Sequence, residues 1–230
     1  MIRRQHLVID ADDTLWENNI YFEQAFARFH DFLAHSTLDA DQVRDHLDAI
    51  EIENIKIHGY GAENFSRNLR QCLAALAERP VSEADLDQVT AFALDILNHP
   101  IVLLDGVAET LMALSERHEL VLFTKGAPAE QQAKIERSGL DHLFDHAAIV
   151  REKDIRAYEQ LATERSFRLD STWMVGNSPK SDINPALHAG WNAAFVPHER
   201  TWSLERMDLV NPGPGKLLVL DRFPDLLQHF

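Results

Sequence analysis

Near the start of the sequence, three consecutive apolar residues at positions 7–9 lead directly into three acids, Asp10, Asp12 and Asp13. An uninterrupted apolar run of this kind is typical of a parallel strand that is buried on both faces. Because carboxylates are rarely buried without a partner, we expect these acids where the strand leaves the sheet. In open α/β sheets, ligands bind at this edge. The segment therefore predicts a ligand site at the carboxyl edge of a parallel sheet.

The spacing of the acids predicts how their side chains point. Side chains alternate along an extended chain, so Asp10 and Asp12 should point the same way and converge on one small volume. Like charges that close together repel, unless a cation lies between them or one of them holds a proton. The alternative is an ordinary acidic loop in which Asp13 or Thr14 caps a turn or a helix.

The sequence changes pattern near residue 100. From residue 16 to residue 99, apolar residues recur at helical spacing, and Ser82 with Asp85 resembles the capping box of a fourth helix. The aromatic stripe of Phe22, Phe26 and Phe29 fits a helical core better than a ligand site. After residue 100, helices alternate with short apolar runs at residues 120–123, 147–150, 173–175, 193–196 and 217–220. This alternation predicts βαβ units and a parallel sheet with helices on both faces.

The bulk composition excludes some functions. The chain has 230 residues with 37 acidic and 22 basic side chains, and its formal charge of −15 repels a nucleic-acid polyanion. No stretch approaches the ~18 to 20 apolar residues of a membrane span. The single cysteine, Cys72, cannot form an internal disulfide and favours a reducing compartment. We therefore expect a cytoplasmic protein, a monomer or homodimer, that binds neither nucleic acid nor membrane.

Polar residues also follow the other predicted strands. Thr124, Lys125 and Gly126 follow the second strand, Lys153 follows the third, and residues 176–182 follow the fourth. Phosphoryl transfer requires a nucleophile, donors for the phosphate oxygens and a hard cation held by oxygen ligands. The paired acids, the anion-binding groups and the second acidic loop could together supply these. Each signal is weak alone, because Thr124 or Asp182 could cap a helix and Lys153 could be a solvated lysine.

Together these segments resemble the four ordered motifs of the haloacid dehalogenase-like (HAD) hydrolase superfamily. The motif segments are residues 10–14, residues 123–126, Lys153 and residues 176–182. The resemblance includes a C1-type helical cap inserted after the first strand. It implies an α/β fold, with a Rossmann-like doubly wound parallel sheet formed by residues 1–16 and 100–230 and an all-helical cap domain at 17–99. It also implies a Mg²⁺-dependent phosphatase that works through an aspartyl-phosphate intermediate.

The same resemblance implies a role for each matching residue. Asp10 would be the nucleophile. Asp12 would protonate the leaving alcohol and later deprotonate water, while its backbone carbonyl binds Mg²⁺. Dehalogenases of this superfamily lack an acid at the position of Asp12, so phosphate chemistry is favoured. Asp182 and Asn177 would complete the metal site, although many relatives have an acid where Asn177 stands.

Thr124 and Lys153 would hold the phosphoryl oxygens, together with the turn at Lys125 and Gly126. Lys153 lacks the proline that often follows it in relatives, so Lys125 or Lys180 remains an alternative source of the charge.

The expected function is a phosphomonoesterase that acts on a small phosphorylated metabolite. A phosphomutase or dehalogenase of the same superfamily, or a non-catalytic binding scaffold, remains an alternative because fold alone does not fix function. Substrate selection is expected from the helical cap, where composition singles out Tyr21, His58, Tyr60 and Asn64.

Overall fold

The computed structural model describes residues 4–230, and the chain forms two compact units. One unit contains the residues up to Asn19 together with Ile101–Phe230, and the other contains Ile20–Pro100. Within the described residues, no helix has both the length and the apolar character needed to cross a membrane.

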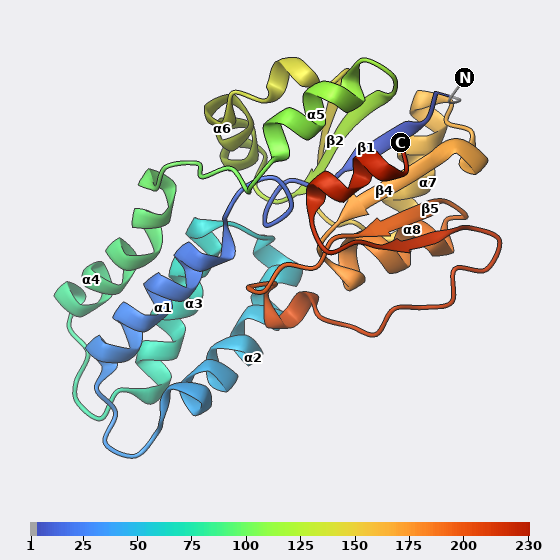
Figure 1. Cartoon of the computed structure of the whole chain (residues 1–230). Helices are drawn as coiled ribbons and strands as arrows, with labels where there is room; N and C mark the ends of the chain where they lie inside the picture. Colours follow the sequence, from blue (N-terminus) through green and yellow to red (C-terminus); the bar gives the residue numbers. More distant parts are fainter. Residues whose placement is uncertain (1–3) are drawn as a thin grey trace. The chain divides into compact units, whose positions relative to one another are not determined.

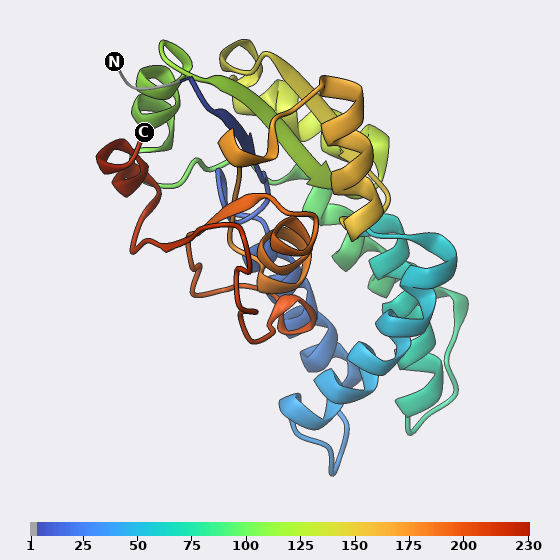
Figure 2. The ribbon, with the colours of Figure 1, turned by 90° about the vertical axis from the view of Figure 1, so that its right-hand side faces the viewer.

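The first unit contains a sheet of six parallel strands in the order β3-β2-β1-β4-β5-β6. Its strands are β1 (His6–Ile9), β2 (Glu119–Lys125), β3 (His146–Val150), β4 (Thr172–Gly176), β5 (Asn192–Phe195) and β6 (Leu217–Val219). β1 lies between β2 and β4, and Figure 2 shows β1 and β2 running side by side in the same direction. The residues that follow these three strands therefore meet at one edge of the sheet, as the sequence predicts.

Helices cover both faces of this sheet (Figure 1). Leu7 and Ile9 pack on one face with α5 (Val107–Ser115), α6 (Pro128–Ser138) and the short helix η6 (Phe223–Gln228). Val8 packs on the other face with α7 (Ile155–Arg165) and α8 (Asn184–His188). Burial on both faces explains the continuous apolar run of β1. The predicted doubly wound, Rossmann-like fold is confirmed.

The second unit is helical. It contains α1 (Asn19–Leu33, whose first residue belongs to the first unit), α2 (Ala40–His58), α3 (Ala62–Leu76), α4 (Glu83–Leu94) and η1 (Asp95–Asn98). Ser82 and Asp85 form the expected capping box at the start of α4. Phe26 and Phe29 are buried in the core of this unit, and Phe22 packs edge-on against Phe65 at 5.1 Å. The aromatic stripe is therefore core, as predicted.

Candidate active site

The chain turns sharply after β1. The N–H of Leu15 donates to the carbonyl of Ala11 at 2.8 Å, and Asp13 adopts a left-handed conformation with φ +59°. The carboxylate of Asp13 accepts hydrogen bonds from the backbone N–H groups of Asn18 (2.8 Å) and Asn19 (3.1 Å), where α1 begins. Asp13 thus caps a helix start, which is the alternative that the sequence allowed for it.

A buried ion-pair cluster forms where three strands end. The ammonium of Lys153, which follows β3, donates to Asp10 Oδ1 at 2.5 Å and to Asp182 Oδ1 at 2.8 Å. The hydroxyl of Thr14 donates to the other oxygen of Asp10, Oδ2, at 2.9 Å. All four residues are buried. The structure thus brings together Asp10, Lys153 and Asp182, which lie far apart in the sequence.

The cluster perturbs the acidity of its members. Burial raises the pKa of Asp10 to about 7, and the charge of Asp182 adds to the shift, while Lys153 acts against it. Burial alone would lower the pKa of Lys153, but the two carboxylates outweigh burial and raise it. With both carboxylates ionised, the cluster carries one net negative charge. It is therefore suited to attract a cation.

Asn177 connects this cluster to the loop after β5. Its amide oxygen accepts from the hydroxyl of Thr14 at 3.3 Å, and its Nδ2 donates to Thr201 Oγ1 at 3.1 Å. The hydroxyl of Thr14 is therefore within hydrogen-bond distance of both Asp10 Oδ2 and Asn177 Oδ1.

Asp12 has a separate set of partners. Its carboxylate accepts from Lys134 Nζ at 2.9 and 3.1 Å, from Gln131 Nε2 at 2.8 Å and from Trp16 Nε1 at 2.8 Å. Burial acts to raise the pKa of Asp12, but Lys134 and the other two donors outweigh it and lower the pKa. Alternation along an extended chain predicts that Asp12 points with Asp10. The chain turns at residues 11–15, and among residues 4–230 no group hydrogen-bonds to both carboxylates.

The three candidate phosphate-binding lysines differ in their surroundings. Lys153 contacts Asp10 directly, whereas the ammonium of Lys125 bonds Glu205 at 2.7 Å and Ser181 Oγ at 2.7 Å. Lys180 is exposed and donates to a backbone carbonyl. Of the three, Lys153 is therefore the lysine placed at Asp10.

Thr124 and Gly126 lie at the end of β2, beside β1. Thr124 is buried in the last part of the strand. The N–H of Gly126 donates to the carbonyl of Val150 at 3.0 Å, so this amide is committed to the sheet rather than directed at an anion. The role of Thr124 in phosphate binding stays a prediction.

Glu205 is a buried site residue that sequence reasoning missed. Its carboxylate accepts from Ser178 Oγ at 2.6 Å, from Ser181 Oγ at 2.5 Å and from Lys125. It thereby ties the irregular loop after β5 to the turn that carries Asp182. No local sequence pattern distinguishes it from an ordinary surface glutamate, because it lies in a one-turn helix within a long loop.

The proposed specificity residues all lie in the helical unit. Tyr21 donates to the carbonyl of Pro100 and stacks on His99 at 4.3 Å. Asn64 is buried and donates to the carbonyl of Gly59 at 2.7 Å. His58 is the exposed last residue of α2, and Tyr60 lies in the following turn. Their contact with a substrate stays a prediction.

The side-chain oxygens of the cluster are suited to bind a hard divalent cation. The carboxylates of Asp10 and Asp182 and the amide of Asn177 offer oxygen, which is the ligand that Mg²⁺ prefers. A second group that could hold a metal ion consists of Asp13, Glu17 and His198, whose ligand atoms lie within 4.8 Å of one another. This second set includes the imidazole of His198, whereas the set around Asp10 offers only oxygen, which is the ligand that Mg²⁺ prefers.

Residues 5–190 match the haloacid dehalogenase-like hydrolases, and the chain belongs to this family. A haloacid dehalogenase-like hydrolase from Xanthomonas campestris is 28% identical, with a TM-score of 0.83 over 99% of this chain and 96% of that one. No curated protein matches the sequence significantly.

Two more distant structures share the fold. A predicted phosphoglycolate phosphatase from Haemophilus somnus is 18% identical, with a TM-score of 0.68 over 100% of this chain and 99% of that one. L-2-haloacid dehalogenase from Xanthobacter autotrophicus is 15% identical, with a TM-score of 0.65 over 98% of this chain and 97% of that one. The fold therefore occurs in proteins named for two chemistries.

Proposed function

We propose that this hydrolase is a Mg²⁺-dependent phosphomonoesterase that acts on a small phosphorylated metabolite through an aspartyl phosphate on Asp10. The observation that carries the proposal is the setting of Asp10. Lys153 holds one of its carboxylate oxygens and Thr14 holds the other, at the carboxyl edge of the sheet. A buried, oriented carboxylate beside an ammonium is suited to attack an electrophile whose anionic oxygens need a nearby positive charge.

The proposed reaction has two steps. First, a carboxylate oxygen of Asp10 forms a bond to phosphorus, and the bond from phosphorus to the substrate alcohol breaks. Asp12 gives its proton to the leaving oxygen, while Lys153 and Thr124 donate hydrogen bonds to the phosphoryl oxygens. Second, Asp12 takes a proton from water as the water oxygen attacks phosphorus. Inorganic phosphate leaves, and the carboxylate of Asp10 is free again.

The metal site of this proposal uses Asp10, Asp182, Asn177 and the backbone carbonyl of Asp12. When bound, Mg²⁺ supplies positive charge that offsets the charge of the phosphoryl group. Because Asn177 is neutral, this ligand set carries less negative charge than a set with a third carboxylate. We therefore expect comparatively weak Mg²⁺ binding.

Asp12 favours a phosphatase over a dehalogenase. Halide leaves without a proton, whereas an alkoxide leaving group needs one, so an acid at this position serves phosphate chemistry. Because Lys134 and two further donors lower the pKa of Asp12, this acid is ionised in the free protein. The first step therefore requires that Asp12 take up a proton from solvent, to which its side chain is 21% exposed. The single, buried Cys72 favours the reducing cytoplasm as the place of action.

The test measures phosphate release from p-nitrophenyl phosphate by the whole chain. We expect turnover that EDTA abolishes, that added Mg²⁺ restores and that Asp10→Asn removes. Asp141→Asn is the matched control, because Asp141 is an exposed acid in the same unit. Halide release from 2-chloropropionate without any phosphate release would show a dehalogenase instead.

A further inference from the structure

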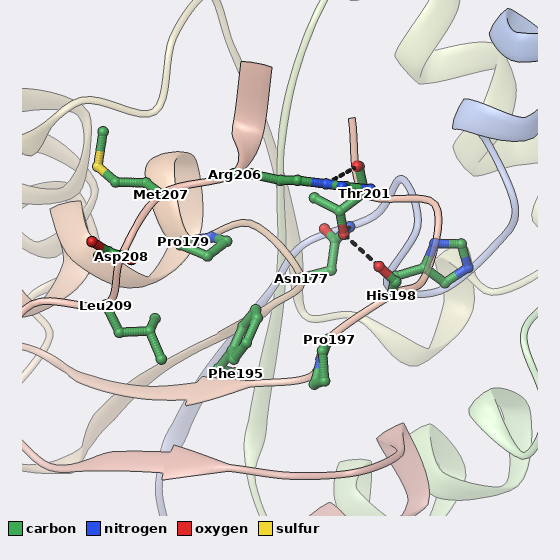
Figure 3. A pocket seen from close by; sticks show the side chains of 10 residues that line it. All are labelled: Asn177, Pro179, Phe195, Pro197, His198, Thr201, Arg206, Met207, Asp208 and Leu209. Carbon is green, nitrogen blue, oxygen red and sulfur yellow. Dashed lines mark hydrogen bonds between the residues drawn. The ribbon is translucent and has the colours of Figure 1, made fainter. Parts of the chain in front are cut away.

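A pocket of about 430 Å³ lies within the first unit, beside Asn177. Its walls come from the turn after β4, the end of β5 and the loop at residues 197–209 (Figure 3). This volume is within the range of small-molecule sites, which is roughly 300 to 1,000 Å³. Asn177, a proposed metal ligand, is one of the lining residues, and the other lining residues take no part in the reaction proposed for Asp10.

One side of the pocket is apolar. Phe195, Pro197 and Leu209 lie on the side opposite the guanidinium of Arg206 (Figure 3). Leu209 and the neighbouring Met207 are 36% and 56% exposed, although they are large apolar side chains. A ring-sized apolar group would bury these surfaces, and such burial contributes about 25 cal/mol per Å².

The other side offers a fixed positive charge. Arg206 Nε donates to the carbonyl of Thr201 at 2.9 Å, and Nη2 donates to the carbonyl of Glu199 at 3.4 Å. A guanidinium has five N–H donors, so these two bonds orient it and leave three for a ligand. The planar fork matches a carboxylate or phosphate group.

The polar side is also tied to the candidate active site. Thr201 is buried, accepts from Asn177 Nδ2 at 3.1 Å and donates to the carbonyl of His198 at 2.9 Å. The backbone that orients Arg206 is therefore held in place before a ligand arrives. Asp208 carries the opposing charge in the lining, but Figure 3 shows it on the far side of the pocket from the guanidinium.

We infer that this pocket is a binding site for a small organic anion. The apolar or aromatic part of the ligand lies against Phe195, Pro197 and Leu209, and its carboxylate or phosphate pairs with Arg206. The inference does not depend on the phosphatase activity, because the ligand contacts proposed here are to residues with no role in that reaction.

The test follows 4-fluorobenzoate by ¹⁹F NMR during titration with the whole chain, with the neutral 4-fluorobenzamide as the comparison probe. We expect saturable binding of the anion and binding of the amide that is about tenfold weaker, as expected for loss of a hydrogen-bonded charge pair. Arg206→Met should weaken binding of the anion by a similar factor. Arg200→Met is the matched control, because Arg200 lies in the same loop outside the pocket lining.

A second variant tests the apolar side. Leu209→Gln should weaken binding of both probes, and the exposed position of Leu209 makes correct folding the expectation. Binding should survive in Asp10→Asn, which separates this result from the outcome of the phosphatase test. Absence of saturation in the wild-type protein, equal affinity for the amide, or an equal loss in Arg200→Met would overturn the inference.

Discussion

Gly176, the last residue of β4, leaves the space that the carboxylate of Asp182 occupies. A Cβ at Gly176 would overlap Oδ2, Cγ and Cβ of Asp182. The carboxylate is held there by the N–H of Ser178 at 2.9 Å, and from this position it reaches Lys153. The absence of one side chain thus positions an acid of the candidate active site.

Gly176→Ala should therefore displace Asp182. We expect a loss of about 1 to 3 kcal/mol in the free energy of unfolding, the usual cost of overpacking a core. Mg²⁺-dependent turnover should fall at least tenfold. Urea denaturation and steady-state assays with p-nitrophenyl phosphate measure the two effects. The control is Gly213→Ala, where φ is +59° but no atom lies near the added Cβ, so stability should fall while turnover stays. Unchanged turnover in Gly176→Ala would contradict the assignment of Asp182.

The three lysines at the strand ends should differ in their effect on catalysis. Lys153→Ala removes the ammonium at Asp10, and we expect kcat/KM to fall about 10²-fold or more, as for loss of one transition-state donor. Lys180→Ala should leave kcat/KM unchanged, because Lys180 is exposed and its ammonium donates to the backbone carbonyl of Leu204 rather than to an acid of the cluster. Lys125→Ala should mainly lower stability, since Glu205 would lose its buried counter-charge. Normal turnover in Lys153→Ala would refute its role.

Asp12→Asn should affect substrates according to their leaving group. Turnover of an alkyl phosphate should fall about 10²- to 10⁴-fold, because the alkoxide needs a proton from Asp12. Turnover of p-nitrophenyl phosphate should fall much less, since p-nitrophenolate is a stable anion. Parallel steady-state assays with the two substrates give the ratio. An equal loss for both would show that Asp12 serves only to hold the structure.

Glu51 should make the stability of the helical unit depend on pH. Burial in α2 raises the pKa of Glu51 from 4.5 to about 7, with Asp48 adding to the shift and Arg44 opposing it. Within the described residues, Glu51 Oε2 is buried without a hydrogen-bond partner. The protonated acid is therefore the favoured form in the folded state. Between about pH 4.5 and 7, Glu51 stays protonated in the folded state but ionises in the unfolded state. The stabilisation that protonated Glu51 gives is therefore complete below about pH 4.5 and is lost as the pH rises through about 7.

Glu51→Gln imitates the protonated acid. It should be nearly neutral at about pH 5 and stabilising by up to about 3 kcal/mol at about pH 8, judged by urea denaturation. Glu53→Gln is the control, because Glu53 lies on the same helix with its side chain 70% exposed. A pH-independent difference between Glu51→Gln and the wild-type protein would contradict the buried, protonated state.

The sequence predicts the fold well because the fold depends on short-range patterns. The apolar run at β1, the alternation of strands and helices after residue 100 and the capping box at Ser82 each act over a few residues. The meeting of Asp10, Lys153 and Asp182 also follows, because parallel strands end at one edge of the sheet.

The sequence predicts less about the partners of each acid. The position of Asp12 depends on a turn with a left-handed residue at Asp13 and on Lys134, which lies more than a hundred residues further along the chain. Glu205 ends a one-turn 3-10 helix, η5 (Ser203–Glu205), which is too short to show a periodic pattern. Contacts of this kind depend on tertiary packing, which propensity and spacing do not encode.

The central claim is that Asp10 becomes covalently phosphorylated, and direct trapping tests it. The protein is quenched in acid during turnover of a phosphomonoester, the acyl phosphate is reduced with borohydride, and the peptide that contains residue 10 is sequenced by mass spectrometry. The account predicts homoserine at position 10, only with substrate and Mg²⁺ present and not in Asp10→Asn. Rapid phosphate release with an unmodified Asp10, or trapping at another residue, would contradict it.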